Sequence, residues 1–376
     1  MIAINCVANR PAQLVDMSIE IRGWRMVAPG RLERFACTPL PPAPGYVRVE
    51  VAGCGVCHTD LGYLYGDVPP RKELPLVLGH EAVGVVVEVS VEAAAWLGRR
   101  VLVPAVWPCG RCGACRRGRP TACSRSRMPG NDVDGAFASH VDAPAQHLCA
   151  VDGDEVRPAD ARVGAAGLAL WEIAVVADAV STPLEAIERV GAVDHQLAVV
   201  VGAGGVGAFA LQILRARGAI VAVLDIDPQR LELARRLGAN LALDARGDPK
   251  TLRTQLRELA VARNVATDGW HLFEVSGVRA GQELAWALLT RGGSLSVIGY
   301  TPEAGTFRLS NLMALDATAY GNWGCDPARY PEALRLVASG AVQLRPLVRR
   351  EALDEAPQIL DAVHRRAIRE RVVLVP

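Results

Sequence analysis

Short runs of hydrophobic residues, interrupted by glycine and proline, dominate the chain from about residue 23 to residue 175. Typical runs lie at 46–51, 82–89 and 100–103 and are rich in valine. β-branched residues between frequent turn residues favour short strands over helices. The regular spacing of these strands predicts a barrel-like β domain.

The pattern changes near Ala177, where apolar strands begin to alternate with segments of helical periodicity. The expected strands are 197–201, 220–224, 271–275 and 294–298, and the expected helices are 206–217 and 228–237. Alternation of strands and helices at this spacing predicts an α/β domain with a doubly wound parallel sheet.

The two ends of the chain differ from this central part. Residues 1–22 show no strong periodicity and are expected to form an irregular N-terminal extension. A helix at 331–339 and a strand at 371–375 are expected to rejoin the β domain. We therefore predict a β-rich domain at 23–178 and 323–376, with an α/β domain at 179–322.

A glycine-rich turn is predicted between the first strand and the first helix of the α/β domain. Its sequence, Gly202-Ala203-Gly204-Gly205-Val206-Gly207, fits G-x-G-x-x-G. The first glycine permits the tight turn, the second lets the backbone approach a pyrophosphate, and the third lets the helix pack on the strand. The helix N-terminus attracts the phosphate charge. This motif predicts a dinucleotide site.

The choice of dinucleotide depends on Asp225, which ends the second strand eighteen residues after Gly207. A carboxylate there can accept hydrogen bonds from the ribose hydroxyls but would repel a 2′-phosphate. The sequence therefore predicts NAD rather than NADP. Arg230 is a further candidate for contact with the adenosine ribose, or else a solvated helix residue.

Four cysteines crowd into a glycine-rich segment with Cys-x2-Cys-x2-Cys-x7-Cys spacing. They are Cys109, Cys112, Cys115 and Cys123. A tetrahedral zinc ion with four thiolate ligands is closed to substrate, and its role is to stabilise a loop that has few apolar residues. An iron–sulfur cluster and free thiols are the alternatives.

A second group of candidate ligands comes from separate segments. The motif GVCHTD contains Cys57 and Thr59, and the motif GHE contains His80 and Glu81. Each is weak evidence alone, because Cys57 could be a buried structural residue or could join Cys54 in another thiolate cluster. The surroundings hold too few thiols for a closed site but do hold an imidazole and carboxylates, which favours an open catalytic zinc site.

Composition and charge mainly exclude other classes of protein: nucleic-acid-binding, membrane and secreted proteins. The formal net charge of +1 gives no electrostatic signature of nucleic-acid or membrane binding. No apolar run reaches the roughly 18–20 residues of a membrane helix, and no secretory signal is expected at the start. Cysteines at metal-ligand spacing favour a reducing compartment over a disulfide scaffold, so the protein is expected to be cytoplasmic.

Together these motifs resemble those of the zinc-containing medium-chain alcohol dehydrogenases over almost the whole length after residue 23. GVCHTD, GHE, the four cysteines and VGAGGVG occur in the family's order and spacing. The resemblance implies a GroES-like catalytic domain at 23–178 and 323–376 and an NAD-binding Rossmann domain at 179–322. It also implies two zinc ions per chain, one catalytic and one structural, a small-molecule substrate and a homo-oligomer.

The resemblance also implies a role for each residue of the two short motifs. Cys57 and His80 would be catalytic zinc ligands. Thr59 would take the proton of the alcohol, whose hydride passes to NAD. Asp60 would support His80, and Glu81 would lie behind the metal as a transient ligand.

Two positions depart from the family pattern. Relatives often supply a third catalytic cysteine where this chain reads ADAVSTP, which places Asp178 there. A carboxylate is an acceptable zinc ligand and leaves the formal charge of the site unchanged. Many relatives have a histidine five residues after the catalytic cysteine, where this chain has Gly62, so the proton path beyond Thr59 is unassigned.

More narrowly, the chain resembles the 6-hydroxycyclohex-1-ene-1-carbonyl-CoA dehydrogenases of anaerobic benzoyl-CoA degradation. This resemblance rests on ADAVSTP and on the segments NLMA and GNWGCDP. It implies oxidation of a secondary alcohol on a cyclic acyl-CoA ester to the 6-oxo product. The alternative is an ordinary alcohol or polyol dehydrogenase with a substrate that contains no CoA.

Arginines are concentrated in and just after the four-cysteine segment, which has no acidic residue. They are Arg111, Arg116, Arg117, Arg119, Arg125 and Arg127. Arginine binds phosphates such as those of CoA bidentately, although such a run can also be a solvated loop. A nucleic-acid-binding zinc protein would not explain Asp225 beside the glycine motif, and a zinc-free quinone reductase would need neither Cys57 nor His80.

Overall fold

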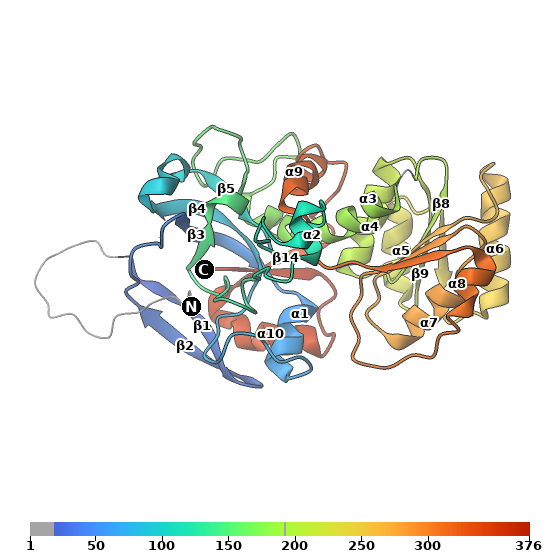
Figure 1. The fold of residues 1–376 in the computed structure, drawn as a ribbon, viewed down its shortest axis with the longest axis horizontal. Helices are drawn as coiled ribbons and strands as arrows, with labels where there is room; N and C mark the ends of the chain where they lie inside the picture. Colours follow the sequence, from blue (N-terminus) through green and yellow to red (C-terminus); the bar gives the residue numbers. More distant parts are fainter. Residues whose placement is uncertain (1–18, 192) are drawn as a thin grey trace, which may run out of the picture. The chain divides into compact units, whose positions relative to one another are not determined.

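The computed structural model describes residues 19–191 and 193–376, which divide into two compact units (Figure 1). Unit 1 contains the described residues up to Asp178, together with Cys325–Gly340 and Leu344–Pro376. Unit 2 contains Ala179–Gly324 and Ala341–Gln343. The chain was expected to change domain at 178/179 and 322/323, and the units change at 178/179 and 324/325.

Unit 1 is built on a seven-stranded sheet in the order β14–β15–β3–β4–β5–β7, with β6 paired to β3. All of its strand pairs are antiparallel except β14 with β15. The strands are β3 (Tyr46–Gly55), β4 (Glu81–Val89), β5 (Arg100–Val103), β6 (His140–Pro144), β7 (Cys149–Ala150), β14 (Val348–Ala352) and β15 (Arg371–Val375).

A separate antiparallel hairpin, β1 (Ile21–Ala28) with β2 (Arg31–Cys37), opens the described part of unit 1. The predicted irregular extension, residues 1–22, lies outside the described residues up to position 18. Its last two residues belong to β1, so there the prediction was wrong. The helices of unit 1 are α1 (His58–Tyr65), α2 (Gly113–Arg116), α9 (Tyr330–Ala338) and α10 (Ala356–His364), with short 3-10 turns that include η4 (Leu170–Ala177).

Strand β3 buries Arg48 on the face where its neighbour Glu50 is exposed, which the alternation of its sequence did not predict. Val47 and Val49 lie in the apolar core, as period-two alternation requires. The intervening Arg48 is also buried, because Asp142 accepts hydrogen bonds from its Nε and Nη2 at 2.9 and 3.0 Å and Glu88 pairs with its Nη1. A buried guanidinium is tolerated when its charge is compensated in this way.

Unit 2 is a six-stranded, wholly parallel sheet in the order β10–β9–β8–β11–β12–β13. The strands are β8 (Leu197–Val201), β9 (Ile220–Asp225), β10 (Leu241–Asp244), β11 (His271–Glu274), β12 (Ser294–Val297) and β13 (Thr318–Gly321). The helices are α3 (Ser181–Val190), α4 (Gly205–Ala216), α5 (Pro228–Arg236), α6 (Pro249–Ala262), α7 (Arg279–Leu288) and α8 (Ser310–Leu315).

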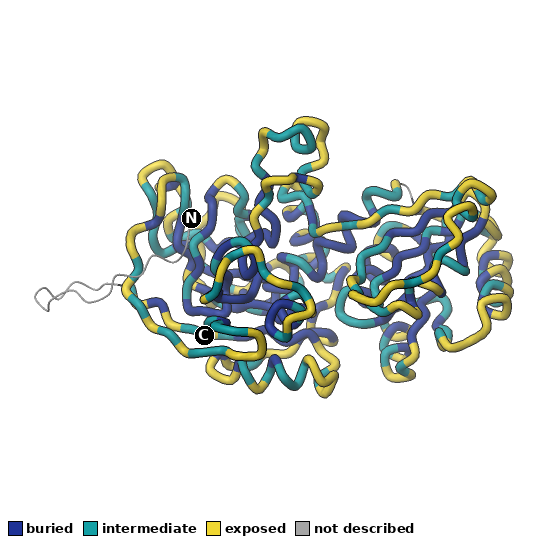
Figure 2. The backbone as a smooth tube through the Cα atoms, turned by 60° about the horizontal axis from the view of Figure 1, so that its bottom comes forward, coloured by how far each residue is buried: buried dark blue, intermediate teal, exposed yellow. Residues whose placement is uncertain are grey.

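This strand order confirms the predicted doubly wound sheet and locates its binding edge. The order reverses between β8 and β11, and ligands of such sheets bind outside the carboxyl ends of the strands at this switch point. Strand β8 is buried along its whole length, as its continuous apolar run predicts. Figure 2 shows the same division in unit 2 between buried strands and more exposed helices and loops.

The expected strands and helices lie within one or two residues of the observed bounds, except β3, which extends four residues further to Gly55. Helices α1, α2, α3, α6, α7, α8 and α10 were not expected. For α6 the sequence did contain a signal, because Asp248 caps the helix by accepting from the backbone N–H groups of Lys250 and Thr251, and Pro249 follows it.

Within the described ranges, every helix is too short or too polar to span a membrane.

Candidate functional site

The glycine-rich turn between β8 and α4 has the geometry of a dinucleotide site. Gly202 has a φ of +104°, and a Cβ there would lie 2.7 Å from the Cα of Ser276. A Cβ at Gly207 would lie 1.9 Å from the carbonyl oxygen of Gly202. At Gly204, by contrast, the nearest atom to a Cβ is Nη1 of Arg230 at 4.0 Å. Packing therefore requires the first and third glycines, and the second leaves room for a ligand beside the backbone.

Asp225 ends β9 beside this turn and is only 6% exposed. The backbone N–H of Ala203 donates to its Oδ2 at 2.6 Å, and the N–H of Asp227 donates to its Oδ1 at 2.8 Å. Nη1 of Arg230 lies 4.0 Å from the same Oδ2. The structure thus brings together the glycine motif, the acidic residue and the arginine that the sequence singled out. All three lie at the carboxyl edge of the sheet.

A second turn at this edge was missed by the sequence analysis. Glu274 ends β11 on the other side of the switch point, and its Oε1 accepts a hydrogen bond from the Ser276 backbone N–H at 2.8 Å. This hydrogen bond shapes the turn at Glu274–Ser276, which lies close to Gly202. Burial raises the pKa of Glu274, and its Oε2 has no hydrogen-bond partner among the described residues. Nothing in the local sequence linked this glutamate to the glycine motif.

In unit 1, four possible metal ligands meet although they come from three separate segments. Ligand atoms of Cys57, His80, Glu81 and Asp178 all lie within 4.8 Å of one another, and we call this group the mixed-ligand cluster. Cys57 precedes α1, the pair His80 and Glu81 lies at the start of β4, and Asp178 follows η4. Oδ2 of Asp178 lies 3.8 Å from the Cys57 sulfur and 3.6 Å from His80 Nε2. The spacing leaves room for one ion between them.

Asp60 orients two members of this cluster. Its buried carboxylate accepts hydrogen bonds from the backbone N–H of Cys57 and of Gly79, each at 3.0 Å, and Oδ1 lies 3.1 Å from His80 Nδ1. Because a carboxylate accepts, Nδ1 carries the proton and the lone pair of Nε2 faces the cluster. Asp60 thus has the supporting place that the resemblance implied.

His80 Nε2 shows that the residues present fit a metal ion. The atom is buried and has no hydrogen-bond partner among the described residues. Such a group costs about 1–3 kcal/mol unless something binds it. Burial lowers the pKa of His80, but Asp60 and Asp178 outweigh that effect and raise the pKa well above its usual range, so a metal ion would have to displace a proton from Nε2 before it could bind the lone pair. A thiolate, an imidazole and a carboxylate are also the ligand types that zinc accepts.

Both carboxylate oxygens of Glu81 are paired with Arg371. The guanidinium Nε of Arg371 donates to Glu81 Oε2 at 3.1 Å, and its Nη2 contacts Oε1. Nη2 also lies 3.9 Å from Asp178 Oδ2. Burial raises the pKa of Glu81 to about 7, while Arg371 acts to lower it. Arg371 was not predicted as a site residue, because in the sequence it is only the first residue of an apolar strand.

Thr59 and Gly62 lie in α1 beside the cluster. Oγ1 of Thr59 lies 3.6 Å from the Cys57 sulfur, which places a hydroxyl next to the candidate ligand atoms. A Cβ built at Gly62 would meet nothing within 4 Å, so a side chain could begin there without a clash. The departure at Gly62 is therefore not forced by packing.

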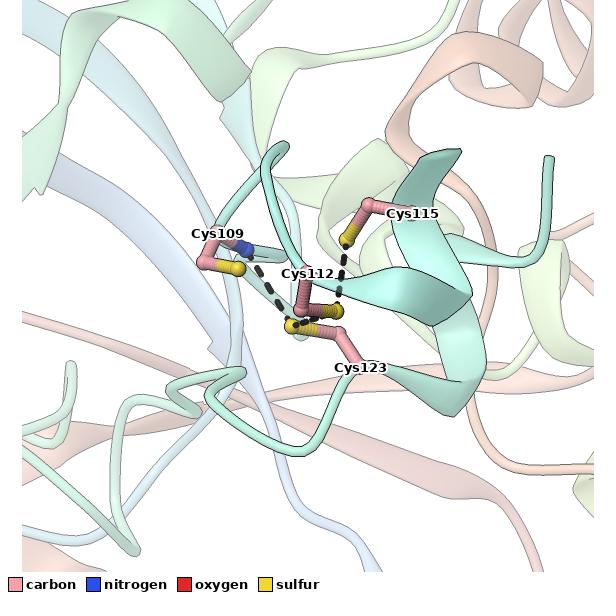
Figure 3. A group of neighbouring side chains, drawn as sticks. All are labelled: Cys109, Cys112, Cys115 and Cys123. Carbon is pink, nitrogen blue, oxygen red and sulfur yellow. Dashed lines mark hydrogen bonds between the residues drawn. The ribbon is translucent and has the colours of Figure 1, made fainter. Parts of the chain in front are cut away.

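The four-cysteine lobe, residues 109–127, forms a second and distinct cluster. Figure 3 shows the sulfur atoms of its four cysteines turned toward one another, and all lie within 4.8 Å. The sulfur of Cys112 lies 3.4 Å from that of Cys115 and 3.7 Å from that of Cys123. Backbone N–H groups of Cys109 and Arg125 donate to the Cys123 sulfur at 3.3 and 3.4 Å.

The cysteine thiols of this lobe differ in pKa, and therefore in how readily they become the thiolates that bind metal. A hydrogen bond from the Cys115 backbone is the largest effect that lowers the pKa of Cys112, to about 6. Burial and the neighbouring thiols raise the pKa of Cys115 to about 11. A bound cation would favour the thiolate form of all four cysteines.

The six arginines of the lobe are all exposed. None of them forms an ion pair with another residue in the described part of the chain. Nη1 of Arg116 donates to the carbonyl oxygen of Arg111 at 2.6 Å.

Comparisons with known proteins agree with this geometry. Residues 43–153 match the family model for the alcohol dehydrogenase GroES-like domain, and residues 205–339 match that for zinc-binding dehydrogenases. The chain is 31% identical to an alcohol dehydrogenase of Geobacillus stearothermophilus, over 88% of this chain and 91% of that protein.

Solved structures of other dehydrogenases also match the fold of this chain. The alcohol dehydrogenase of Aeropyrum pernix is 28% identical, with a TM-score of 0.80 over 94% of this chain and 100% of that one. Galactitol-1-phosphate dehydrogenase of Escherichia coli shares the fold, with 22% identity and a TM-score of 0.83 over 94% of this chain and 100% of that one. The predicted fold, a GroES-like domain with a Rossmann domain, is confirmed. This chain belongs to the zinc-dependent medium-chain alcohol dehydrogenases, oxidoreductases that act on alcohols.

Proposed function

We propose that this protein is an NAD-linked dehydrogenase that oxidises a free alcohol or polyol to the carbonyl compound. The observation that carries the proposal is the mixed-ligand cluster, in which the unpartnered Nε2 of His80 faces the thiol of Cys57 and the carboxylate of Asp178. The Geobacillus and Aeropyrum relatives are named as alcohol dehydrogenases, which supports the alternative without CoA over the acyl-CoA reading.

Cys57, His80 and Asp178 would hold the catalytic zinc. Two anionic ligands and one neutral ligand balance the charge of Zn²⁺. When bound there, zinc supplies a Lewis acid that lowers the pKa of an alcohol. Thr59 Oγ1 would accept the hydroxyl proton and release its own proton in exchange. NAD bound at the glycine turn would supply the acceptor for the carbinol hydride, so that loss of this hydride together with the hydroxyl proton would convert the alcohol to a carbonyl compound.

Asp225 would select NAD at the other site. Its carboxylate is already fixed by two backbone N–H groups, so it cannot swing away from a ligand bound at the glycine turn. A 2′-phosphate would therefore meet a fixed negative charge. Arg230, 4.0 Å from Asp225, would contact the same adenosine ribose.

A structural zinc would occupy the four-cysteine lobe, which gives two zinc ions per chain. Four thiolates close the coordination sphere, so this ion would hold the lobe together without taking part in the reaction. A cytoplasmic location is proposed because thiols kept free for metal ligation favour a reducing compartment, although Cys37 is disulfide-bonded.

The cyclic hydroxyacyl-CoA ester is retained as a second candidate substrate. It is favoured by the six exposed arginines of the lobe, because guanidinium groups without carboxylate partners are suited to phosphates. The segments ADAVSTP, NLMA and GNWGCDP add the sequence resemblance.

A homo-oligomer is proposed from the edge of the unit 2 sheet. Strand β13 is the last in the strand order, and Met313 of the neighbouring α8 is 78% exposed, with Leu309 just before that helix 72% exposed. An edge strand beside apolar side chains is suited to pairing with a second copy of the chain.

The zinc content tests both clusters. Elemental analysis of the purified protein should give two zinc ions per chain, and Asp178→Ala should lose one of them with nearly all turnover, because it removes one of three catalytic ligands. The exposed carboxylate variant Asp154→Ala is the control and should keep both. Two zinc ions retained in Asp178→Ala, or one in the wild type, would contradict the assignment.

The coenzyme preference tests Asp225. The ratio of kcat/KM with NADP to that with NAD should rise about fivefold to thirtyfold in Asp225→Ser, because relief of repulsion from one fixed charge is worth on the order of 1–2 kcal/mol. Glu232→Gln removes a charge from the exposed face of α5 and should leave the ratio unchanged. A wild-type preference for NADP would show that Asp225 does not select NAD.

The substrate is tested by NADH formation across simple alcohols, polyols and a cyclic hydroxyacyl-CoA ester. We expect turnover of a CoA-free alcohol, with a KM that does not change in the double variant Arg116→Gln, Arg117→Gln. If the lobe binds CoA phosphates instead, that variant should raise KM for the ester at constant kcat, since such contacts are equal in the ground and transition states. The control is Arg263→Gln with Arg291→Gln. Turnover of the ester alone would overturn the preferred substrate.

A further inference from the structure

Asp178 is held differently from the other two ligands of the proposed catalytic zinc. Asp60 fixes Cys57 and His80, whereas Asp178 directly follows η4 and is the last residue before the chain passes from unit 1 into unit 2. Its Oδ2 lies 3.8 Å from the Cys57 sulfur and 3.6 Å from His80 Nε2. A group that binds a metal has to stay within about 0.5 Å of its productive position. The backbone that carries Asp178 therefore needs a fixed point of its own.

We propose that Tyr330 is a positioning residue for the catalytic zinc, because its hydroxyl fixes the backbone that carries Asp178. The proposal rests on the zinc site proposed above. It adds to that site a residue that is not itself a ligand and that acts only through Asp178.

The hydroxyl of Tyr330 bridges two segments of unit 1. It donates a hydrogen bond to the carbonyl oxygen of Ala177 at 2.5 Å, and the backbone N–H of Ala105 donates to it at 3.1 Å. Tyr330 and Ala177 are both fully buried, so bulk water does not compete for these groups. A phenol has a single proton to donate, and here the proton goes to the carbonyl of the residue that precedes Asp178.

Ala105 gives this bridge a rigid anchor. It lies between β5 and the four-cysteine lobe. Just beyond it, Trp107 and Arg127 exchange backbone hydrogen bonds at 2.8 and 3.1 Å, which closes the base of the lobe. The indole N–H of Trp107 also donates to the carbonyl oxygen of Pro104 at 2.7 Å. Residues on both sides of Ala105 are therefore fixed, and the tyrosine hydroxyl extends this rigidity to Ala177.

Helix α9 holds the tyrosine ring in place. Tyr330 is the first residue of this helix, and it shares one buried face with Ala333, Leu334 and Val337. This is the i, i+3, i+4, i+7 spacing of a helix face that packs on a core. Because the ring is held by this packing, removal of the hydroxyl alone should leave the ring where it is.

Without the hydroxyl, the carbonyl oxygen of Ala177 would lose a donor inside the core. A buried carbonyl that lacks a hydrogen bond is unfavourable, so the turn would shift toward another donor. Asp178 would move with its neighbour, and its carboxylate would leave the position opposite Cys57 and His80.

The test is Tyr330→Phe, which removes only the hydroxyl. Zinc affinity would be measured by chelator competition, with the four-cysteine site as an internal reference, and the ligand geometry by the visible spectrum of the cobalt-substituted protein. We expect zinc to bind the mixed-ligand cluster at least about tenfold more weakly and the four cysteines with unchanged affinity. The cobalt spectrum should change, because it depends on the type and geometry of the ligands. A smaller loss of affinity or an unchanged spectrum would overturn the proposal.

The matched control is Ser139→Ala in the same unit. The buried hydroxyl of Ser139 also accepts a hydrogen bond from a backbone N–H, that of Arg22 at 3.0 Å. This variant should lower Tm, as Tyr330→Phe does, but should change neither the zinc affinity nor the cobalt spectrum. Equal weakening of zinc binding in both variants would reflect general destabilisation and would also overturn the proposal.

Hydrogen exchange keeps the proposal falsifiable if Tyr330→Phe does not fold. In Asp178→Ala, which should lack the catalytic zinc, the Ala105 amide should exchange within about threefold of its rate in the wild type, because its bond to the tyrosine does not depend on the metal. Faster exchange would show that the metal orders this segment and would overturn the proposal. A wild-type protein with no zinc at the mixed-ligand cluster would refute the proposed function, whereas zinc there that is insensitive to Tyr330→Phe would refute only this inference.

Discussion

The buried carboxylate of Asp60 joins the two segments on which the candidate metal site depends. It accepts hydrogen bonds from the backbone of Cys57 and Gly79 and fixes the ring of His80. A carboxylate that is fully removed from water is stable only when its oxygens are satisfied in this way. The thiol at the start of α1 and the imidazole at the start of β4 are therefore set in place before any metal arrives.

The rest of the cluster follows from the need to balance charge in a buried space. Asp178 brings a third ligand from the end of η4, and Glu81 brings a fourth carboxyl group that must be neutralised separately. Arg371 does this from β15. Three elements far apart along the chain, η4, β4 and β15, thus contribute to one site.

In unit 2 the constraint is close packing rather than charge. The Glu274–Ser276 turn lies so near Gly202 that no side chain fits between them. The backbone N–H of Ala203 holds Asp225 against the same turn. Two turns on either side of the switch point are thereby fixed, and an anionic dinucleotide can approach the exposed backbone at Gly204.

Most of the fold could be predicted from the sequence, because its strands are locally encoded by apolar runs. Strand β3 was predicted too short, since its last residues are held by pairing with β4 and β15 rather than by their own propensity. Helix α6 was missed although Asp248 and Pro249 mark its start.

The candidate site was predictable only where its residues lie in short motifs. Cys57, Asp60 and His80 belong to GVCHTD and GHE, and Asp178 was identified only by the resemblance to the family. Arg371 is 290 positions from Glu81, and no local pattern marks a lone arginine at the start of an apolar strand as part of a metal site. Contacts of that range follow from the tertiary fold alone.

The central claim is that zinc occupies both clusters and that the mixed-ligand cluster binds it through three side chains. Anomalous diffraction at the zinc edge from crystals of the full chain tests this most directly. The account predicts two peaks per chain, one within the four cysteines and one between the Cys57 sulfur, His80 Nε2 and Asp178 Oδ2, with Glu81 still paired to Arg371. A single peak at the four cysteines would contradict it.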